Sequence, residues 1–174
     1  TTPSQAVILK KAYSEARKII CVGTKLKRSL CAYVSDPDKV TVIPNFVDTN
    51  TFAFSPHRTE KEKHFTFISI GNLNKRKGFW DLLTAFHWAF KDMPHVSLLI
   101  AGDGEEMQSL KEQIQSLHLE EQVKLTGRLS REELSGLLAT CDAFVLASFA
   151  ETFGIVFIEA MATGLPAIGT VALL

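Results

Sequence analysis

This sequence has few cysteines and histidines and no excess of charge of either sign. Its three cysteines, Cys21, Cys31 and Cys141, fit no CxxC, zinc or haem spacing. Its five histidines do not pair at metal-binding spacing, and no HExxH motif occurs. We therefore expect buried free thiols in a reducing compartment and no metal site.

Long apolar runs are also missing. The longest weakly polar stretch, residues 160–174, has 15 residues and contains Pro166 and two glycines. A membrane-spanning helix needs about 20 apolar residues. The first residues are polar and lysine-rich rather than apolar, so no signal peptide is visible in the sequence. These features favour a cytoplasmic protein.

The net charge is zero, because 19 basic side chains balance 19 acidic ones. This balance argues against a polyanion-binding protein, so no nucleic-acid partner is expected. It hides an asymmetry, since residues 1–63 carry +5 and residues 64–174 carry −5. A sign change within a short chain indicates a junction. We predict the end of one domain and a junction over 1–54, a polar linker over 55–63, and a second domain over 64–174.

The apolar pattern predicts a sheet with helices between its strands. Short, almost wholly apolar runs predict strands at 18–22, 39–43, 65–70, 96–101, 122–126, 143–147 and 165–169. Helical spacing predicts helices over 4–17 and 24–34 and in each gap between strands from residue 78 onward. Strands that are apolar throughout are typical of a parallel sheet covered on both faces. We therefore predict an α/β fold with a Rossmann-like parallel sheet.

Ligands of such sheets bind beyond the carboxyl ends of the strands. The loop after the strand at 65–70, residues 71–78, has glycine at both ends and places Lys75, Arg76 and Lys77 before a helix. Such a loop suits a phosphate, because glycine permits close backbone approach and a helix N-terminus attracts anions. A solvated basic loop explains the same residues, and neither GxxxxGK[ST] nor GxGxxG is present.

Two glutamates follow the strand at 143–147. Glu151 lies at the mouth of an apolar strand, and Glu159 interrupts an otherwise apolar helical run. A carboxylate on so apolar a helix needs a donor partner or hydroxyls to bind. Eight helical residues rise roughly 12 Å, which disfavours the closer carboxylate pair of a glycosidase. Two such acceptors suit the hydroxyls of the two sugar rings of a nucleotide sugar.

These residues fall into blocks that resemble a known family. Residues 151–159 match the E-x7-E motif of the retaining glycosyltransferases of family 4, and residues 160–166 resemble its continuation. Further blocks resembling the family occur in order at 42–48, 70–78, 101–104 and 126–129. The resemblance implies a GT-B architecture of two Rossmann-like domains. It makes 64–174 a nucleotide-sugar-binding C-terminal domain, incomplete at its end, and 1–54 the end of the acceptor-side domain.

The resemblance also implies site residues. Lys77 would contact the donor diphosphate, Glu151 the transferred sugar near the reacting centre, and Glu159 the ribose hydroxyls; Glu151 and Lys77 would be the catalytic pair. The other donor-binding positions would be Gly71, Asn72, Arg76, Gly102, Gly127, Arg128, Leu129, Phe153, Gly154 and Ile155. Family members generally need no metal or other cofactor, because cations and helix ends hold the diphosphate, so none is expected.

The function implied by the resemblance is transfer of a hexose from a nucleoside diphosphate sugar to an acceptor with retention of configuration. Two departures stand against it. Asn72 replaces the usual arginine of the first loop and so removes a bidentate phosphate donor, and Phe46 replaces a glycine. The alternatives are a catalytically weak or inactive sugar-nucleotide-binding module and a GT-B-type sugar-nucleotide epimerase.

The partners implied are the nucleotide sugar, a glycan or lipid-linked acceptor, and the remainder of a GT-B chain, without which these residues are expected to be inactive. The predicted helix at 24–34 carries Lys25, Lys27 and Arg28. These cations fit an ordinary solvated face, and they equally fit peripheral contact with anionic lipid headgroups at the cytoplasmic membrane face.

Overall fold

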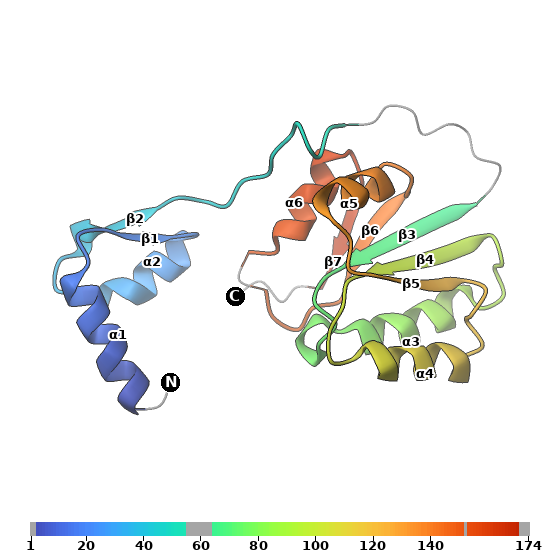
Figure 1. Cartoon of the computed structure of the whole chain (residues 1–174), viewed down its shortest axis with the longest axis horizontal. Helices are drawn as coiled ribbons and strands as arrows, with labels where there is room; N and C mark the ends of the chain where they lie inside the picture. Colours follow the sequence, from blue (N-terminus) through green and yellow to red (C-terminus); the bar gives the residue numbers. More distant parts are fainter. Residues whose placement is uncertain (1–2, 55–63, 152, 171–174) are drawn as a thin grey trace. The chain divides into compact units, whose positions relative to one another are not determined.

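The structure, a computed structural model, describes residues 3–54, 64–151 and 153–170. The chain forms two compact units, Thr1–Phe46 and Val47–Leu174. The second unit contains the main sheet of the molecule (Figure 1).

The first unit is built on two parallel strands. Its elements are α1 (Pro3–Glu15), β1 (Ile19–Cys21), α2 (Thr24–Cys31), a 3₁₀ turn (Pro37–Lys39) and β2 (Val40–Val42). β1 pairs with β2 in parallel, and α2 provides the crossover that parallel neighbours need. Cys21, Val34 and Val40 are buried together as a small core of this unit.

The second unit is a five-stranded parallel sheet. Its strands are β3 (Phe65–Ile70), β4 (Val96–Ala101), β5 (Val123–Gly127), β6 (Ala143–Leu146) and β7 (Ala167–Gly169). They lie in the order β5-β4-β3-β6-β7, and each pairing is parallel. The predicted strands agree with these to within two residues at either end.

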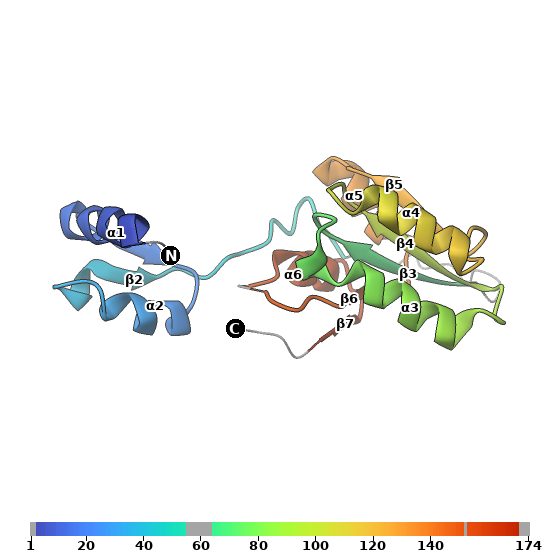
Figure 2. The ribbon, with the colours of Figure 1, turned by 90° about the horizontal axis from the view of Figure 1, so that it is seen from below.

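Helices cover both faces of this sheet. They are α3 (Phe79–Phe90), α4 (Met107–Ser116), α5 (Arg131–Leu138) and α6 (Ile155–Ala162), with a 3₁₀ turn, η2 (Lys75–Lys77), before α3. α3 and α4 lie on one face, and α5 and α6 lie on the other (Figures 1 and 2). The predicted α/β class, with a Rossmann-like sheet between two helical layers, is confirmed.

The core explains why the strands are apolar along their whole length. Ile68 and Leu98 of the central strands and Phe144 of β6 are completely buried, as are Phe79 and Leu83 of α3. Burial of each such side chain stabilises the fold by about 1.5–3 kcal/mol. Because both faces of the sheet are covered, no strand needs a polar side.

A capping box at Ser130 determines where α5 begins. The Ser130 hydroxyl accepts a hydrogen bond from the Glu133 N–H at 3.2 Å, and the Glu133 carboxylate accepts one from the Ser130 N–H at 2.8 Å. The sequence pattern predicts this capping box, and the structure confirms it. The box makes Arg131 the first residue of the helix.

The boundary between the units lies earlier in the chain than the charge pattern predicts. Residues 47–54, assigned from the sequence to the piece before the linker, belong to the second unit. Phe52 is completely buried in the core of that unit, and the Ser135 hydroxyl of α5 donates to the Thr51 carbonyl at 2.5 Å. The burial of one aromatic side chain, Phe52, therefore determines the boundary between the units, and the distribution of surface charge does not. The predicted linker, 55–63, lies outside the described residues.

Candidate nucleotide-sugar site

The order of the strands defines where a ligand site can form. The chain runs outward from β3 to β4 and β5, and then returns to place β6 on the other side of β3. The direction of winding therefore reverses between β3 and β6. In doubly wound sheets, ligands bind at the carboxyl ends of the strands beside this reversal.

The loops after β3 and β6 meet at this reversal. Gly78, which ends η2, has a φ of +65°, and a Cβ there would collide with the Ala147 carbonyl just after β6. The Phe149 N–H donates to the Arg76 carbonyl at 2.9 Å. Only glycine permits so close an approach, and it brings the basic turn against the loop that carries Glu151.

Lys77 and Glu151 form a buried ion pair between these two loops. The Lys77 Nζ contacts Glu151 Oε1, and the Ser148 hydroxyl donates to the same oxygen at 2.9 Å. The two charged side chains are only 14% and 10% exposed. The sequence predicts both residues for the site, and the structure brings them together across 74 positions of chain.

Glu159 is buried on α6 and has a partner. Its side chain is 9% exposed, and Arg131 Nη2 lies 3.4 Å from Glu159 Oε1. Burial raises the pKa of Glu159 above its ordinary value, and the Arg131 charge partly offsets this. The sequence predicts that this carboxylate needs a donor, but it does not identify Arg131, which lies 28 positions earlier. The sequence places Arg131 at the start of the preceding helix, and this position alone does not identify it as the donor to Glu159.

The N-terminus of α6 follows Glu151 directly. Gly154 caps the helix with a φ of +70°. Phe153 is half-buried and Ile155, the first helical residue, is exposed. The N–H groups at the start of the helix can donate hydrogen bonds to an anion or to the oxygen of a sugar hydroxyl. Thr152 lies outside the described residues.

A pocket of about 260 Å³ opens beside the reversal point, at the ends of β3, β4 and β5. It is lined by Ile70, Gly71, Asn72, Ala101, Gly102, Asp103, Arg128, Leu129 and Leu134. Five of the predicted donor-binding residues thus share one cavity: Gly71, Asn72, Gly102, Arg128 and Leu129. Gly127 lies at the end of β5, where its carbonyl accepts from the Gly102 N–H at 2.9 Å. Lys77, Glu151 and Glu159 are not among the lining residues.

Asn72 lies against the turn that follows β4. Its Oδ1 would be 2.6 Å from a Cβ built on Gly104, so the amide occupies space above that glycine. Arg76, the other predicted cation of the loop, is exposed on η2. Its backbone carbonyl holds the loop after β6, while its side chain faces solvent.

The described ranges contain neither a metal-binding cluster nor a membrane-spanning helix. No three His, Cys, Asp or Glu side chains gather there in a group that could hold a metal ion. No helix there is long and apolar enough to cross a bilayer. Independence from metal stays a prediction, since an absent cluster does not test what the reaction requires.

Comparison with known proteins defines the family. The model of the glycosyl transferases group 1 matches residues 51–172, and the model of glycosyltransferase family 4 matches residues 2–51. The first match alone covers well over half of the chain. The chain therefore belongs to the glycosyl transferases group 1 family, and the predicted family resemblance is confirmed.

Two curated relatives illustrate the range of the family. The chain is 28% identical to the N-acetyl-alpha-D-glucosaminyl L-malate synthase of Bacillus anthracis, over 97% of the chain and 45% of the relative. It is 34% identical to the alpha-monoglucosyldiacylglycerol synthase of Streptococcus pneumoniae, over 86% of the chain and 36% of the relative. The chain thus spans less than half the length of either relative.

A solved structure supports the architecture. The Anabaena protein Alr3699/HepE, in complex with UDP and glucose, aligns with a TM-score of 0.81 and 24% identity. The alignment covers 99% of this chain and 50% of that one. The fold is that of the GT-B glycosyltransferases.

Proposed function

We propose that these residues bind the donor in a glycosyltransferase that moves a hexose from a nucleoside diphosphate sugar to an acceptor with retention of configuration. One observation carries the proposal. Lys77 and Glu151 meet at the reversal point of the sheet, beside the pocket between β3, β4 and β5. Glu159, the second glutamate of the motif, is buried on the helix that follows.

Each part of a nucleotide sugar has a matching part of this site. The pocket suits the base, with the backbone at Arg128 and Leu129 along one wall. Glu159 accepts hydrogen bonds from ribose hydroxyls, and Glu151 contacts the transferred sugar. Lys77 can serve Glu151 and the diphosphate together, because an ammonium group has three donors.

The chemistry of the step is electrostatic. Negative charge develops on the leaving diphosphate as the glycosidic bond breaks. The Lys77 ammonium and the N–H groups at the start of α6 would stabilise that charge. They would serve in place of a metal ion. Retention of configuration is proposed from the family 4 match and the E-x7-E motif.

The acceptor is proposed to be lipid-linked or a glycan. One relative is by name an alpha-monoglucosyldiacylglycerol synthase, which supports a lipid acceptor. Lys25 and Arg28 of α2 are exposed and can meet anionic headgroups at the cytoplasmic membrane face. Sedimentation with phosphatidylserine vesicles tests this contact, and recovery of the protein in the supernatant at low salt rejects it.

Calorimetric titration with UDP-, GDP- and ADP-hexoses tests the donor site. We expect one of these to bind and Lys77→Ala to weaken it at least tenfold, because a charged hydrogen bond to phosphate is lost. Lys75→Ala is the matched control on the same turn and should bind normally. Equal affinity in the wild type and Lys77→Ala would reject the role of Lys77.

A sugar-nucleotide-binding module without transfer is the second candidate, and Asn72 favours it. Asn72 lines the pocket where an arginine would offer two parallel donors. This candidate predicts donor binding without product in the protein at its natural length. Transfer detected by NMR of the product, with the anomeric configuration of the donor, would reject it. Conversion of the donor without acceptor would indicate an epimerase.

A further inference from the structure

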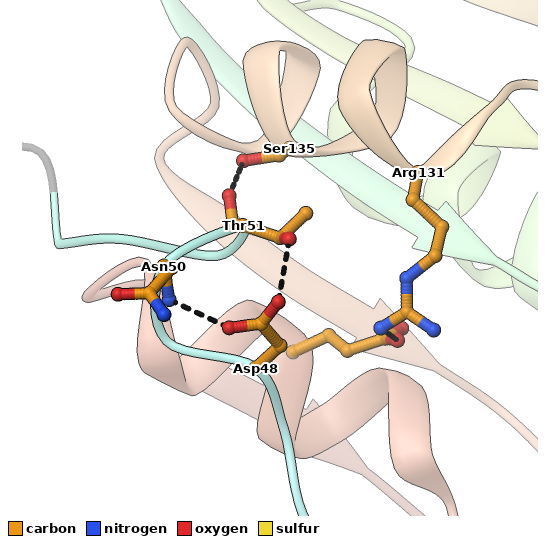
Figure 3. Close-up of polar contacts among 6 residues, drawn as sticks. Asp48, Asn50, Thr51, Arg131 and Ser135 are labelled. Atoms are coloured by element: carbon orange, nitrogen blue, oxygen red, sulfur yellow. Dashed lines mark hydrogen bonds and ion pairs between the residues drawn. The ribbon is translucent and has the colours of Figure 1, made fainter.

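Arg131 joins two elements at the edge of the proposed site. Its Nη2 lies 3.4 Å from Glu159 Oε1 on α6, and its Cζ lies 5.3 Å from the centre of the Phe52 ring. The guanidinium therefore contacts a carboxylate and an aromatic face at the same time. Figure 3 shows Arg131 reaching down from the start of its helix beside the segment that carries Asp48 and Thr51.

The Phe52 ring and the turn before it are held in place by burial and by hydrogen bonds. Phe52 is completely buried. The residues before it form a compact turn, in which the Asn50 N–H and the Thr51 hydroxyl donate to the Asp48 carboxylate, each at 2.9 Å. The Ser135 hydroxyl ties the Thr51 carbonyl to α5 one turn after Arg131 (Figure 3). An arginine stacked on such a ring loses much of its rotational freedom before it meets its partner.

The two partners of the Arg131–Glu159 ion pair differ in their exposure to solvent. The Glu159 side chain is 9% exposed, whereas that of Arg131 is 59% exposed. The guanidinium can be solvated without Glu159, but a buried Glu159 charge depends on a partner. The contact is made to Oε1. A carboxylate has two oxygens and about four acceptor sites, so Glu159 retains capacity for hydroxyl donors.

We propose that Arg131 is a positioning residue for the donor. Stacked on Phe52, it holds Glu159 by Oε1 and so presents the other carboxylate oxygen to the ribose hydroxyls. The inference rests on the proposed function, since it takes Glu159 to be the ribose ligand. The inference adds two parts to the proposed site. One is Arg131, which makes no contact with the donor itself, and the other is the segment 48–52, which supports Arg131.

The test measures the preference for ribose over a sugar without hydroxyls. UDP, GDP and ADP and their 2′,3′-dideoxy counterparts are titrated into the protein, and the tightest ribonucleotide is compared with its own counterpart. We expect the wild type to prefer the ribonucleotide by about tenfold or more, as hydrogen bonds to a charged group allow. Arg131→Met should reduce this preference to within about threefold, and Glu159→Ala should do the same.

Two further variants separate positioning from general damage. Arg131→Lys keeps the charge but loses the planar fork, so its preference should lie between those of the wild type and Arg131→Met. Lys111→Met removes an exposed charge on α4 and should leave the preference unchanged. The preference is a ratio measured on one sample, so a lowered stability does not alter it.

The outcomes distinguish the two hypotheses. If no ribonucleotide binds the wild type, the proposed function fails and this inference fails with it. If the wild type discriminates, Glu159→Ala does not, and Arg131→Met discriminates as well as the wild type, the proposed function stands and the role of Arg131 is overturned. If the wild type binds both nucleotides equally, Glu159 is not the ribose ligand and the inference is wrong.

Discussion

Single buried charges set the energetics of the site. Both side chains of the Lys77–Glu151 pair are largely buried, whereas the Arg131–Glu159 pair is buried only at the carboxylate. Removal of one partner from a doubly buried pair leaves an uncompensated charge in the interior. Removal of the exposed partner from a one-sided pair instead changes the ionisation of the buried group. The two pairs should therefore respond differently to substitution.

Replacement of Lys77 by methionine should destabilise the protein by about 3 kcal/mol, because Glu151 is left buried without its cation. Addition of Glu151→Gln should recover most of this loss, since no charge is then buried. Urea denaturation of the two single variants and the double variant measures the coupling. Additive losses would show that the pair has no net interaction.

Replacement of Glu159 by glutamine should raise the melting temperature at neutral pH by a few degrees. The pKa of Glu159 is raised by burial above its ordinary 4.5, so the folded state binds more protons than the unfolded state just above that pH. The contribution of Glu159 to the stability of the wild type therefore falls as the pH rises through the window above 4.5. Glutamine does not ionise, so the variant lacks this dependence of stability on pH.

Melting curves of the two proteins across this pH window provide the measurement. The curves should nearly coincide at the acidic end, where Glu159 is protonated, and separate as the pH rises. The glutamine variant should nevertheless bind the donor more weakly. Parallel pH profiles would show that Glu159 titrates normally in the folded protein.

Tight turns at the ends of elements bring the site together. The 3₁₀ turn η2 leads into α3 through Gly78, where the backbone is left-handed and packed against the carbonyl of Ala147. This contact sets the distance between the turn that carries Lys77 and the loop that carries Glu151. Helix propensity does not explain the glycine at position 78, because even a Cβ atom there would collide with the Ala147 carbonyl.

Gly78→Ala should lower the free energy of unfolding by at least about 2 kcal/mol, because a left-handed conformation and a backbone clash both oppose a Cβ. Gly136→Ala is the matched control within α5, where a Cβ would meet nothing within 4 Å. It should stabilise the protein by about 0.5–1 kcal/mol through helix propensity. Equal effects in the two variants would contradict the close approach at Gly78.

The whole molecule is two units whose boundary is decided by packing. Val47 begins the second unit, and Phe52 anchors its first residues in the core. The same residues support Arg131 through the Phe52 ring. The segment 47–54 thus belongs to the second unit through the burial of Phe52 and through its contacts with α5.

A chain beginning at residue 47 should therefore unfold cooperatively, with the stability of the second unit retained. A chain beginning at residue 55 should lose about 3–5 kcal/mol, because Phe52 is removed from the core. Phe52→Ala in the intact chain should reproduce the loss, whereas Phe46→Ala, at a side chain that is 79% exposed, should not. Equal stability of the two shortened chains, measured by urea denaturation, would restore the boundary predicted from charge.

The order and type of the elements are local properties, and the sequence alone was enough to predict them. Apolar runs such as 65–70 and 96–101 match their strands, and Ser130 with Glu133 predicted where α5 begins. The apolar runs around Glu151 and Glu159 indicated both glutamates as candidate site residues, and the E-x7-E block contains both. These features depend on neighbours within a few residues, where spacing and side-chain type carry the information.

Only the tertiary structure decided which residues meet. The pairing of Lys77 with Glu151 and the contact of Arg131 with Glu159 join positions 74 and 28 residues apart. The winding order of the strands determines the first contact, and the position of α5 and α6 on the same face of the sheet determines the second. The burial of Phe52 likewise moved the boundary that surface charge had indicated. Burial and long-range contact are properties of the folded chain, so no local pattern could supply them.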